Sequence, residues 1–238
     1  MKHNFSMEGF AYRLRPIKLD DAQFIIDVRL EDAERNKYIH RISSDVSAQE
    51  AWLNKYFERE GDYYFVVENR LTGEREGLIG FYDAAGGKAE WGRWVIKKGS
   101  LAAVESVDLL YRIAFEMVGL EELYCRTLEL NAEVVSFHTS IGEQKRRLIT
   151  DAFEIDGEKY NAVEQYADRD IFYNGIHPSL QKKSAMIFRR NMRSLVGRFQ
   201  FHHIGVACRD IEKEFPIFSL LGYTRESSLF EDELQGVK

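Results

Sequence analysis

The chain has 238 residues, 45% of them hydrophobic and 13% aromatic, which is enough for one sizeable core and a smaller additional piece. Its net charge is -6, from 33 basic and 39 acidic residues spread along the chain, which argues against a nucleic-acid-binding protein. No run approaches the ~20 apolar residues of a membrane span, and the first residues, MKHNFSMEGF, contain no apolar signal-peptide segment. Cys125 and Cys208 lie far apart in apolar runs, which is typical of buried thiols in a reducing compartment. We therefore expect a cytoplasmic protein.

The predicted elements begin after a tail at residues 1–9. Alternating residues 12–15 predict a strand that ends at Pro16, and Asp20 or Asp21 can cap the helix that follows. Residues 31–46 are charged and irregular, and we interpret His40 there as a surface residue. Ser47 and Glu50 have the spacing of a capping box at the start of a second amphipathic helix.

Three apolar runs then predict an antiparallel meander. Strands are expected at residues 63–67, 78–82 and 91–96, with turns at 71–74 and 86–87. A helix over 103–118 crosses over to a strand at 123–128. The fold class expected from this order is α/β, with a mixed, mostly antiparallel central sheet flanked by helices on both faces.

The turn between the third strand and the crossover helix is a candidate anion site. Small residues there allow backbone N–H groups to approach a ligand, and a helix N-terminus supplies unpaired donors and a positive dipole. The residues of this turn are Lys98, Gly99, Ser100, Leu101, Ala102, Ala103 and Val104. A plain strand-to-helix turn without a ligand is the alternative.

Two spaced motifs resemble the GNAT superfamily of acyl-CoA-dependent N-acyltransferases, and the RimJ/RimL-like and amino-sugar branches are the most similar. The family's pyrophosphate loop has a basic residue and two small residues where this chain has Lys98, Leu101 and Ala103. Its second motif is an Asn, a Tyr seven residues later and a Gly four residues after that. This chain has Asn131, His138 and Gly142, so the spacing is kept and the tyrosine is replaced. Leu101 in place of glycine is the other departure.

The resemblance implies a donor site for acetyl-CoA or another acyl-CoA. In the family, a strand that splays from its neighbour binds pantetheine through backbone groups, which here would be those of Val95 and Ile96. The other cofactor-binding positions implied are the turn residues 98–104 and Asn131. His138 would donate a proton to the leaving thiolate, in the place of the family's tyrosine. A packing or hydrogen-bonding role for His138 is the alternative.

The base that accepts the amine proton is less defined by the sequence. Glu129 and Glu90 are candidates, and a chain of water molecules without a single base is equally compatible with the pattern. Arg126 is five residues before Asn131, where some relatives have a glutamate. It would bind an anionic acceptor or form a surface salt bridge. No metal site is expected.

The resemblance covers roughly residues 11–170, with a closing hairpin after Gly142. We expect an acyltransferase domain at 10–172, a linker at 173–198 and a separate segment at 199–238. That segment resembles the opening of vicinal-oxygen-chelate proteins of the glyoxalase and methylmalonyl-CoA epimerase type, with His203 at their first metal-ligand position. One ligand is too few for a metal site, so we expect an incomplete fusion segment without metal function.

The expected function is N-acylation of a primary amine, on a nucleotide-linked amino sugar or another small molecule. One alternative is acetylation of a protein N-terminus, as by ribosomal-protein acetyltransferases, and another is a non-catalytic acyl-CoA-binding module. A homodimer is left open.

Overall fold

The computed structural model describes residues 2–32, 36, 38, 39, 41–155, 157–198, 211–220 and 224. The chain divides into a unit at Met1–Ser194 and a unit at Leu195–Lys238. In the second unit, the described element is helix α7 at Ile211–Leu220. Most of the predicted fusion segment, with His203, lies outside the described residues, as does His40.

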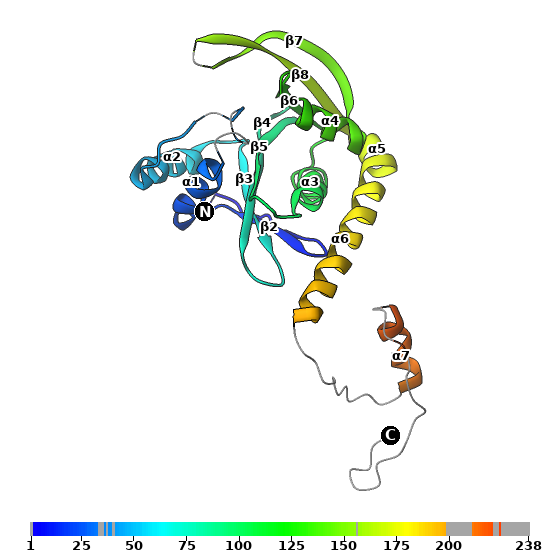
Figure 1. The fold of residues 1–238 in the computed structure, drawn as a ribbon. Helices are drawn as coiled ribbons and strands as arrows, with labels where there is room; N and C mark the ends of the chain where they lie inside the picture. Colours follow the sequence, from blue (N-terminus) through cyan, green and yellow to red (C-terminus); the bar gives the residue numbers. More distant parts are fainter. Residues whose placement is uncertain are drawn as a thin grey trace, which may run out of the picture. The chain divides into compact units, whose positions relative to one another are not determined.

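The first unit is built on one eight-stranded sheet with the order β1-β2-β3-β4-β5-β6-β8-β7 (Figure 1). The β5–β6 pair is parallel and the other pairs are antiparallel, which confirms the predicted mixed sheet. The strands are β1 (Met7–Glu8), β2 (Tyr12–Pro16), β3 (Tyr63–Asn69), β4 (Arg75–Ala85), β5 (Lys88–Ile96), β6 (Glu122–Leu128), β7 (Gln144–Ile155) and β8 (Glu158–Asp168).

Helices cover both faces of this sheet. Figure 1 shows α1 and α2 on one side, with α3 and α6 on the other. The helical elements that begin in the first unit are η1 (Leu19–Asp21), α1 (Ala22–Leu30), α2 (Val46–Glu58), α3 (Ala103–Arg112), the π-turn η2 (Ile113–Val118), α4 (Ala132–Ile141), α5 (Arg169–Ile171), η3 (Phe172–Ile176) and α6 (His177–Arg198).

Hydrophobic side chains that alternate between the two faces of the central strands form two separate cores. Phe65 and Ile79 face the α3 side, whereas their neighbours Tyr64 and Leu78 face α1 and α2. Successive strand side chains point to opposite faces, so each strand contributes to both cores. The sheet is therefore buried on both sides.

Two buried carboxylates of helix α3 fix it to the rest of the domain. Glu105 accepts hydrogen bonds from the backbone N–H groups of Phe10 and Ala11, which tie the helix to the entry of β2. One turn later, Asp108 lies 2.6 Å from His177 Nδ1 and accepts a 2.6 Å hydrogen bond from Gln181 Nε2. Burial raises the pKa of Asp108, and the contact with His177 opposes that shift. The start of α6 is thus docked on α3.

The segment expected as a linker at 173–198 is therefore helical and in part belongs to the domain. Ile176 and Leu180 are fully buried in the α3-side core. The sequence prediction missed the packing of this segment on the domain, because the basic residues in the second half of α6 dominate its composition. The domain also begins before residue 10, since Phe5 and Met7 pack against the same core.

Helix α2 begins two residues earlier than the predicted capping box implied. Asp45 is its N-cap and accepts a 3.0 Å hydrogen bond from Ser47 N. A carboxylate at the N-cap satisfies a free N–H and interacts favourably with the helix dipole. Ser47 is therefore inside the first turn.

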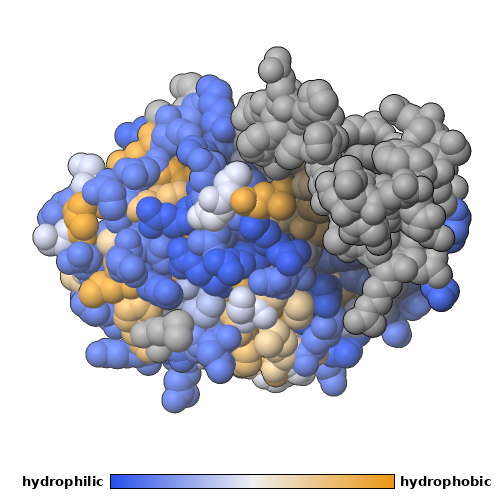
Figure 2. Space-filling model, turned by 90° about the horizontal axis from the view of Figure 1, so that it is seen from below, coloured by the Kyte–Doolittle hydropathy of each residue, from blue (hydrophilic) through white to orange (hydrophobic). Residues whose placement is uncertain are grey.

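Hydrophobic residues are separated by hydrophilic ones on the face of the molecule seen in Figure 2. Scattered exposed apolar side chains are usual for folded proteins. Within the described part of the chain, no helix combines the length and apolar character needed to cross a membrane.

Candidate functional site

Strands β5 and β6 separate along their length. They pair only from Lys88–Glu122 to Glu90–Tyr124, after which β5 runs on to Ile96 and β6 to Leu128 without further ladder contacts. Unpaired backbone groups inside a protein need partners. The separation therefore leaves a place where an extended ligand would satisfy them.

A bulge in β5 accompanies this separation. Leu78 is opposite Val95 and Gly80 is opposite Gly92, so two residues of β5 face a single residue of β4. One of the two, Arg93, has a φ of 48°. Bulges of this kind bend a strand and end its regular pairing.

Arg93 is held firmly in this unusual backbone conformation. Its guanidinium group donates hydrogen bonds of 2.6 and 2.9 Å to the two carboxylate oxygens of Asp62 and lies 4.6 Å from the ring centroid of Tyr82. A bidentate pair stacked on an aromatic ring has a defined geometry. The bulge is thus fixed from the α2 side of the sheet.

The separated strands border a cavity of about 910 Å³. It is lined by β5, β6, the start of α3, α4, the end of β7 and residues between α1 and α2. Five of the predicted site residues line it, namely Val95, Ile96, Ala103, Asn131 and His138.

His138 is packed into the cavity wall and is 2% exposed. Its ring makes an edge-to-face contact with Trp91 at a centroid distance of 4.9 Å. Nδ1 lies 3.0 Å from Glu143 Oε2, within ion-pair distance, although the ring is turned away from a linear hydrogen bond. The imidazole is thus at the cavity with an acidic partner beside it.

The structure separates Glu129 from this group. Glu129 is exposed after the end of β6, is not among the residues that line the cavity, and accepts a 3.1 Å hydrogen bond from Asn161 Nδ2. Its side chain is hydrogen-bonded outside the cavity lining, so the structure gives no support to its assignment as the base, which stays a prediction. The regular strand ends at Leu128, one residue before it.

Glu90 and Arg126 lie where β5 and β6 are still close to one another. Arg126 contacts Glu90 at 3.2 Å and Glu164 at 3.1 Å, and Tyr82 donates a 3.3 Å hydrogen bond to Glu90. Burial raises the pKa of Glu90 above its ordinary value, while Arg126 opposes the shift. Both residues line the cavity, and each is already paired with the other.

The predicted anion turn is partly filled by the protein's own groups. Lys98 N donates a 2.8 Å hydrogen bond to Glu31, and Ala102 N donates one of 3.1 Å to Ser100 Oγ. Gly99 has a φ of 82°, which requires a glycine at this turn. The first bond of α3 runs from Ser106 N to Ala102 O, so the N–H groups of residues 103–105 precede it. The first-turn N–H groups of α3 are thus available to an anion, whereas Lys98 N and Ala102 N are already bonded, so the anion site is smaller than the sequence predicts.

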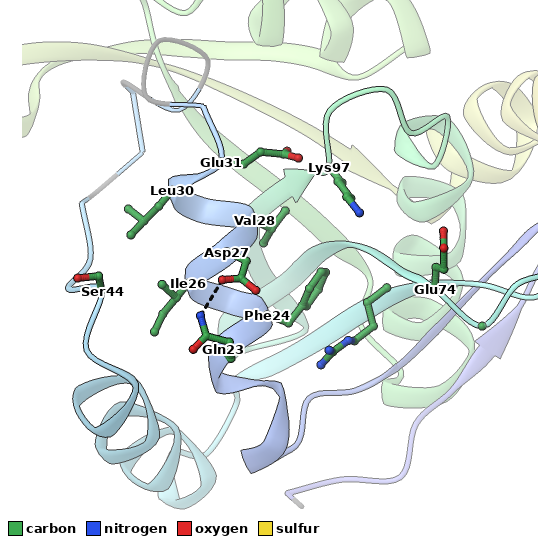
Figure 3. Close-up of a pocket in the computed structure, with 12 residues that line it drawn as sticks. Gln23, Phe24, Ile26, Asp27, Val28, Leu30, Glu31, Ser44, Glu74 and Lys97 are labelled. Atoms are coloured by element: carbon green, nitrogen blue, oxygen red, sulfur yellow. Dashed lines mark hydrogen bonds between the residues drawn. The ribbon is translucent and has the colours of Figure 1, made fainter.

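A second hollow, of about 810 Å³, lies on the other side of this turn. Figure 3 shows it beside α1, with the carboxylate of Glu31 directed toward the turn that carries Lys97. Gln23 and Asp27 are joined there by a 2.7 Å hydrogen bond. None of the site residues predicted from the sequence lines this hollow, and we assign it no ligand.

Glu143 is the residue that the sequence reasoning missed. It is 4% exposed, directly follows the motif glycine Gly142, and accepts hydrogen bonds from Tyr111 (2.7 Å) and Cys125 (3.4 Å). No local signal marks it, because an acidic residue after a glycine that ends a helix usually lies at the surface. Burial raises the pKa of the Cys125 thiol well above its ordinary value, so the thiol stays protonated.

Comparisons with known proteins agree with this geometry. Residues 12–144 match the model of the acetyltransferase (GNAT) domain family. Apo FdhC, described as a nucleotide-linked sugar GNAT, is 26% identical, with a TM-score of 0.62 over 75% of this chain and 98% of that one. No curated protein matches the sequence significantly.

Two further solved structures share the fold at lower identity. A variant of the spermidine N-acetyltransferase SpeG from Vibrio cholerae is 18% identical, with a TM-score of 0.60 over 70% of this chain and 98% of that one. A GCN5-related N-acetyltransferase from Brucella melitensis is 16% identical, with a TM-score of 0.64 over 78% of this chain and 86% of that one. The chain belongs to the GNAT family, and it is an acyl-CoA-dependent N-acetyltransferase.

Proposed function

We propose that the enzyme transfers an acetyl group from acetyl-CoA to the primary amine of a nucleotide-linked amino sugar. The observation that carries this proposal is the charge of the cavity between β5 and β6. Its lining contains five arginines and three glutamates, and no lysine or aspartate is among the lining residues described (Arg29, Arg41, Arg59, Arg93 and Arg126; Glu90, Glu133 and Glu154). Arginines suit the diphosphate of such an acceptor.

Acetyl-CoA fits the donor side of the cavity. The N–H groups at the start of α3 supply donors and a positive dipole for its pyrophosphate. The separated edges of β5 and β6 border the part of the cavity where the pantetheine arm would lie, with Val95 and Ile96 on the β5 side. Asn131 lines the same cavity at the N-cap of α4, and its side chain is not used as a cap.

The reaction needs an electrophilic carbonyl and a route for one proton. The neutral amine attacks the thioester carbon, the oxyanion forms, and the CoA thiolate leaves. A backbone N–H of the separated β5 would polarise the carbonyl. His138, at the wall of this cavity, is the proposed donor of a proton to the departing sulfur.

The charge of the cavity favours an anionic acceptor over a polyamine. Arg93 and Arg126 are paired within the protein, but Arg41 is exposed at the cavity. A polycation such as spermidine, the substrate named for SpeG, would be repelled by these groups. The relative at 26% identity is named for nucleotide-linked sugars, which supports the same acceptor class.

The test is CoA release from acetyl-CoA with a panel of amines: a nucleotide-linked amino sugar, spermidine and a short peptide with a free N-terminus. We expect turnover with the sugar nucleotide. Reversing the charge at Arg41 (Arg41→Glu) should raise KM for that acceptor by at least ~10-fold through lost diphosphate contact and leave KM for acetyl-CoA unchanged.

A matched control is Lys55→Glu, which reverses an exposed charge on α2 outside the cavity lining. It should leave both KM values unchanged. Release with spermidine alone would contradict the acceptor class. If acetyl-CoA binds but none of the amines gives CoA release, the protein would be an acyl-CoA-binding module without catalysis.

A further inference from the structure

The carboxylate of Glu143 is buried in a cluster of proton donors. Tyr111 donates a 2.7 Å hydrogen bond to Oε1, Cys125 Sγ donates one of 3.4 Å to Oε2, and His138 Nδ1 lies 3.0 Å from Oε2. The Glu143 side chain has no exposed surface. Among the ion pairs of the described residues, the group of opposite charge at Glu143 is His138.

A buried carboxylate is costly unless a positive charge or strong donors compensate for it. Tyr111 and Cys125 supply neutral donors to the carboxylate, and the imidazole of His138 is the group beside Oε2 that can carry a positive charge. A carboxylate 3.0 Å away interacts favourably with that charge when the ring holds a proton during the reaction. The same carboxylate lies beside Nδ1 without the geometry of a regular hydrogen bond, so we take Nε2 as the ring nitrogen that would meet a substrate in the cavity.

His138 is also held in place by packing. Trp91 contacts its ring edge to face, and Phe137 and Trp94 lie at centroid distances of 5.8 and 6.4 Å. A catalytic proton carrier needs a fixed orientation toward the reacting atoms. The aromatic rings and Glu143 together define that orientation.

We propose that His138, positioned by Glu143, is the base of the reaction as well as its acid. This inference rests on the proposed function and supplies a proton acceptor that, unlike Glu129, lines the cavity. The amine nitrogen forms its bond to the thioester carbon and gives one proton to His138 Nε2. The carbon–sulfur bond then breaks, and the CoA thiolate takes that same proton from Nε2. The products are the amide and CoA-SH, and His138 returns to its neutral form.

The cluster has a second interpretation as a metal site. Ligand atoms of Cys125, His138 and Glu143 all lie within 4.8 Å of one another, and these residue types bind zinc. However, the carboxylate already accepts hydrogen bonds at both oxygens, so it is satisfied by the protein's own donors. We therefore favour the His138–Glu143 pair, and metal content is one outcome of the test.

The test is a double-mutant cycle on kcat, measured by CoA release. Glu143→Gln should lower kcat by ~10²-fold, the low end of general acid–base effects, with KM for acetyl-CoA unchanged. In the His138→Phe background, the same change should have no further effect, because Glu143 acts through His138. Glu121→Gln makes the same change at an exposed glutamate outside the cavity lining and is the matched control, with kcat expected within about threefold of the wild type.

Equal losses from Glu143→Gln in both backgrounds would overturn the proposal, as would an unchanged kcat in the single variant. One zinc ion per chain, lost in Glu143→Gln, would assign the cluster to a metal instead. A wild-type measurement needs no variant to fold: nitrogen NMR of the neutral imidazole should show Nδ1 protonated and Nε2 free. The opposite tautomer would refute the pair even if no acceptor amine is found, which separates this failure from failure of the proposed function.

Discussion

At the scale of single residues, His138 carries the clearest prediction. His138→Phe keeps an aromatic ring among Trp91, Trp94 and Phe137 and removes the transferable proton. It should lower kcat by ~10²-fold and leave acetyl-CoA affinity nearly unchanged. His138→Tyr restores the family's residue and should retain more activity than His138→Phe. Steady-state kinetics with a working acceptor decide this, and equal kcat in wild type and His138→Phe would give the residue a structural role.

Lys98 should contribute less to donor binding than its place in the motif suggests. Its side chain is 71% exposed and already lies 3.2 Å from Asp32. Lys98→Ala is therefore expected to weaken acetyl-CoA binding by at most about 1 kcal/mol, as for an exposed charge contact. Calorimetric titration measures the affinity for acetyl-CoA. A hundredfold larger dissociation constant in the variant would show that Lys98 binds the pyrophosphate directly.

Residue spacing predicted part of the site from sequence alone. The turn before α3, the splaying strand and the interval from Asn131 to Gly142 each have local patterns, and the structure gathers residues of all three at one cavity. Glu143 had no such pattern. Its partners Tyr111 and Cys125 come from α3 and β6, so their convergence depends on tertiary packing that no local sequence rule encodes.

At the scale of elements, Asp21 connects the first helix to two strands. It accepts hydrogen bonds of 2.8 and 2.9 Å from Arg15 on β2 and one of 3.1 Å from Arg75 on β4. Burial alone would raise the pKa of Asp21, but the hydrogen bonds from Arg15 and Lys18 N outweigh it and lower the pKa. The ionised carboxylate therefore stabilises the folded state.

Asp21→Asn should reduce the free energy of unfolding by about 2–3 kcal/mol at neutral pH, since it leaves two arginines with a neutral partner. For a lowered pKa, this stabilisation is present above the ordinary value of 3.8 and is lost as the pH falls through the folded-state pKa. The deficit of the variant should thus shrink in urea unfolding below pH 3.8. Asp20→Asn, at an exposed neighbour, is the control and should change little at either pH.

Elements were predicted better than their boundaries. The meander, the crossover helix and the closing hairpin follow from alternation and turn residues, which are local properties. The docking of α6 was not predicted, because it depends on Asp108 of α3 meeting His177 and Gln181 across a long sequence separation. Composition alone made this segment resemble a solvated connector.

At the scale of the whole molecule, the two units suggest a division of roles. The described contacts of the cavity all come from Met1–Ser194, the first compact unit. Removing residues 199–238 should therefore leave acetyl-CoA affinity and kcat within about twofold of the full chain. The control is a thermal melt of the shortened protein. Loss of activity in a protein that still folds and binds acetyl-CoA would show that the C-terminal segment takes part in catalysis.

The central claim is that acetyl-CoA binds where β5 leaves β6 and α3 begins. Calorimetric titration of acetyl-CoA into Ala103→Asp, compared with Ala48→Asp, tests it most directly. Both changes place an aspartate in the first turn of a helix, where it suits the helix dipole, but only Ala103 lines the cavity. We predict that Ala103→Asp weakens binding at least ~10-fold, or about 1.4 kcal/mol, through repulsion of the pyrophosphate, and that Ala48→Asp binds as the wild type does. Equal affinities in the two variants would contradict the account.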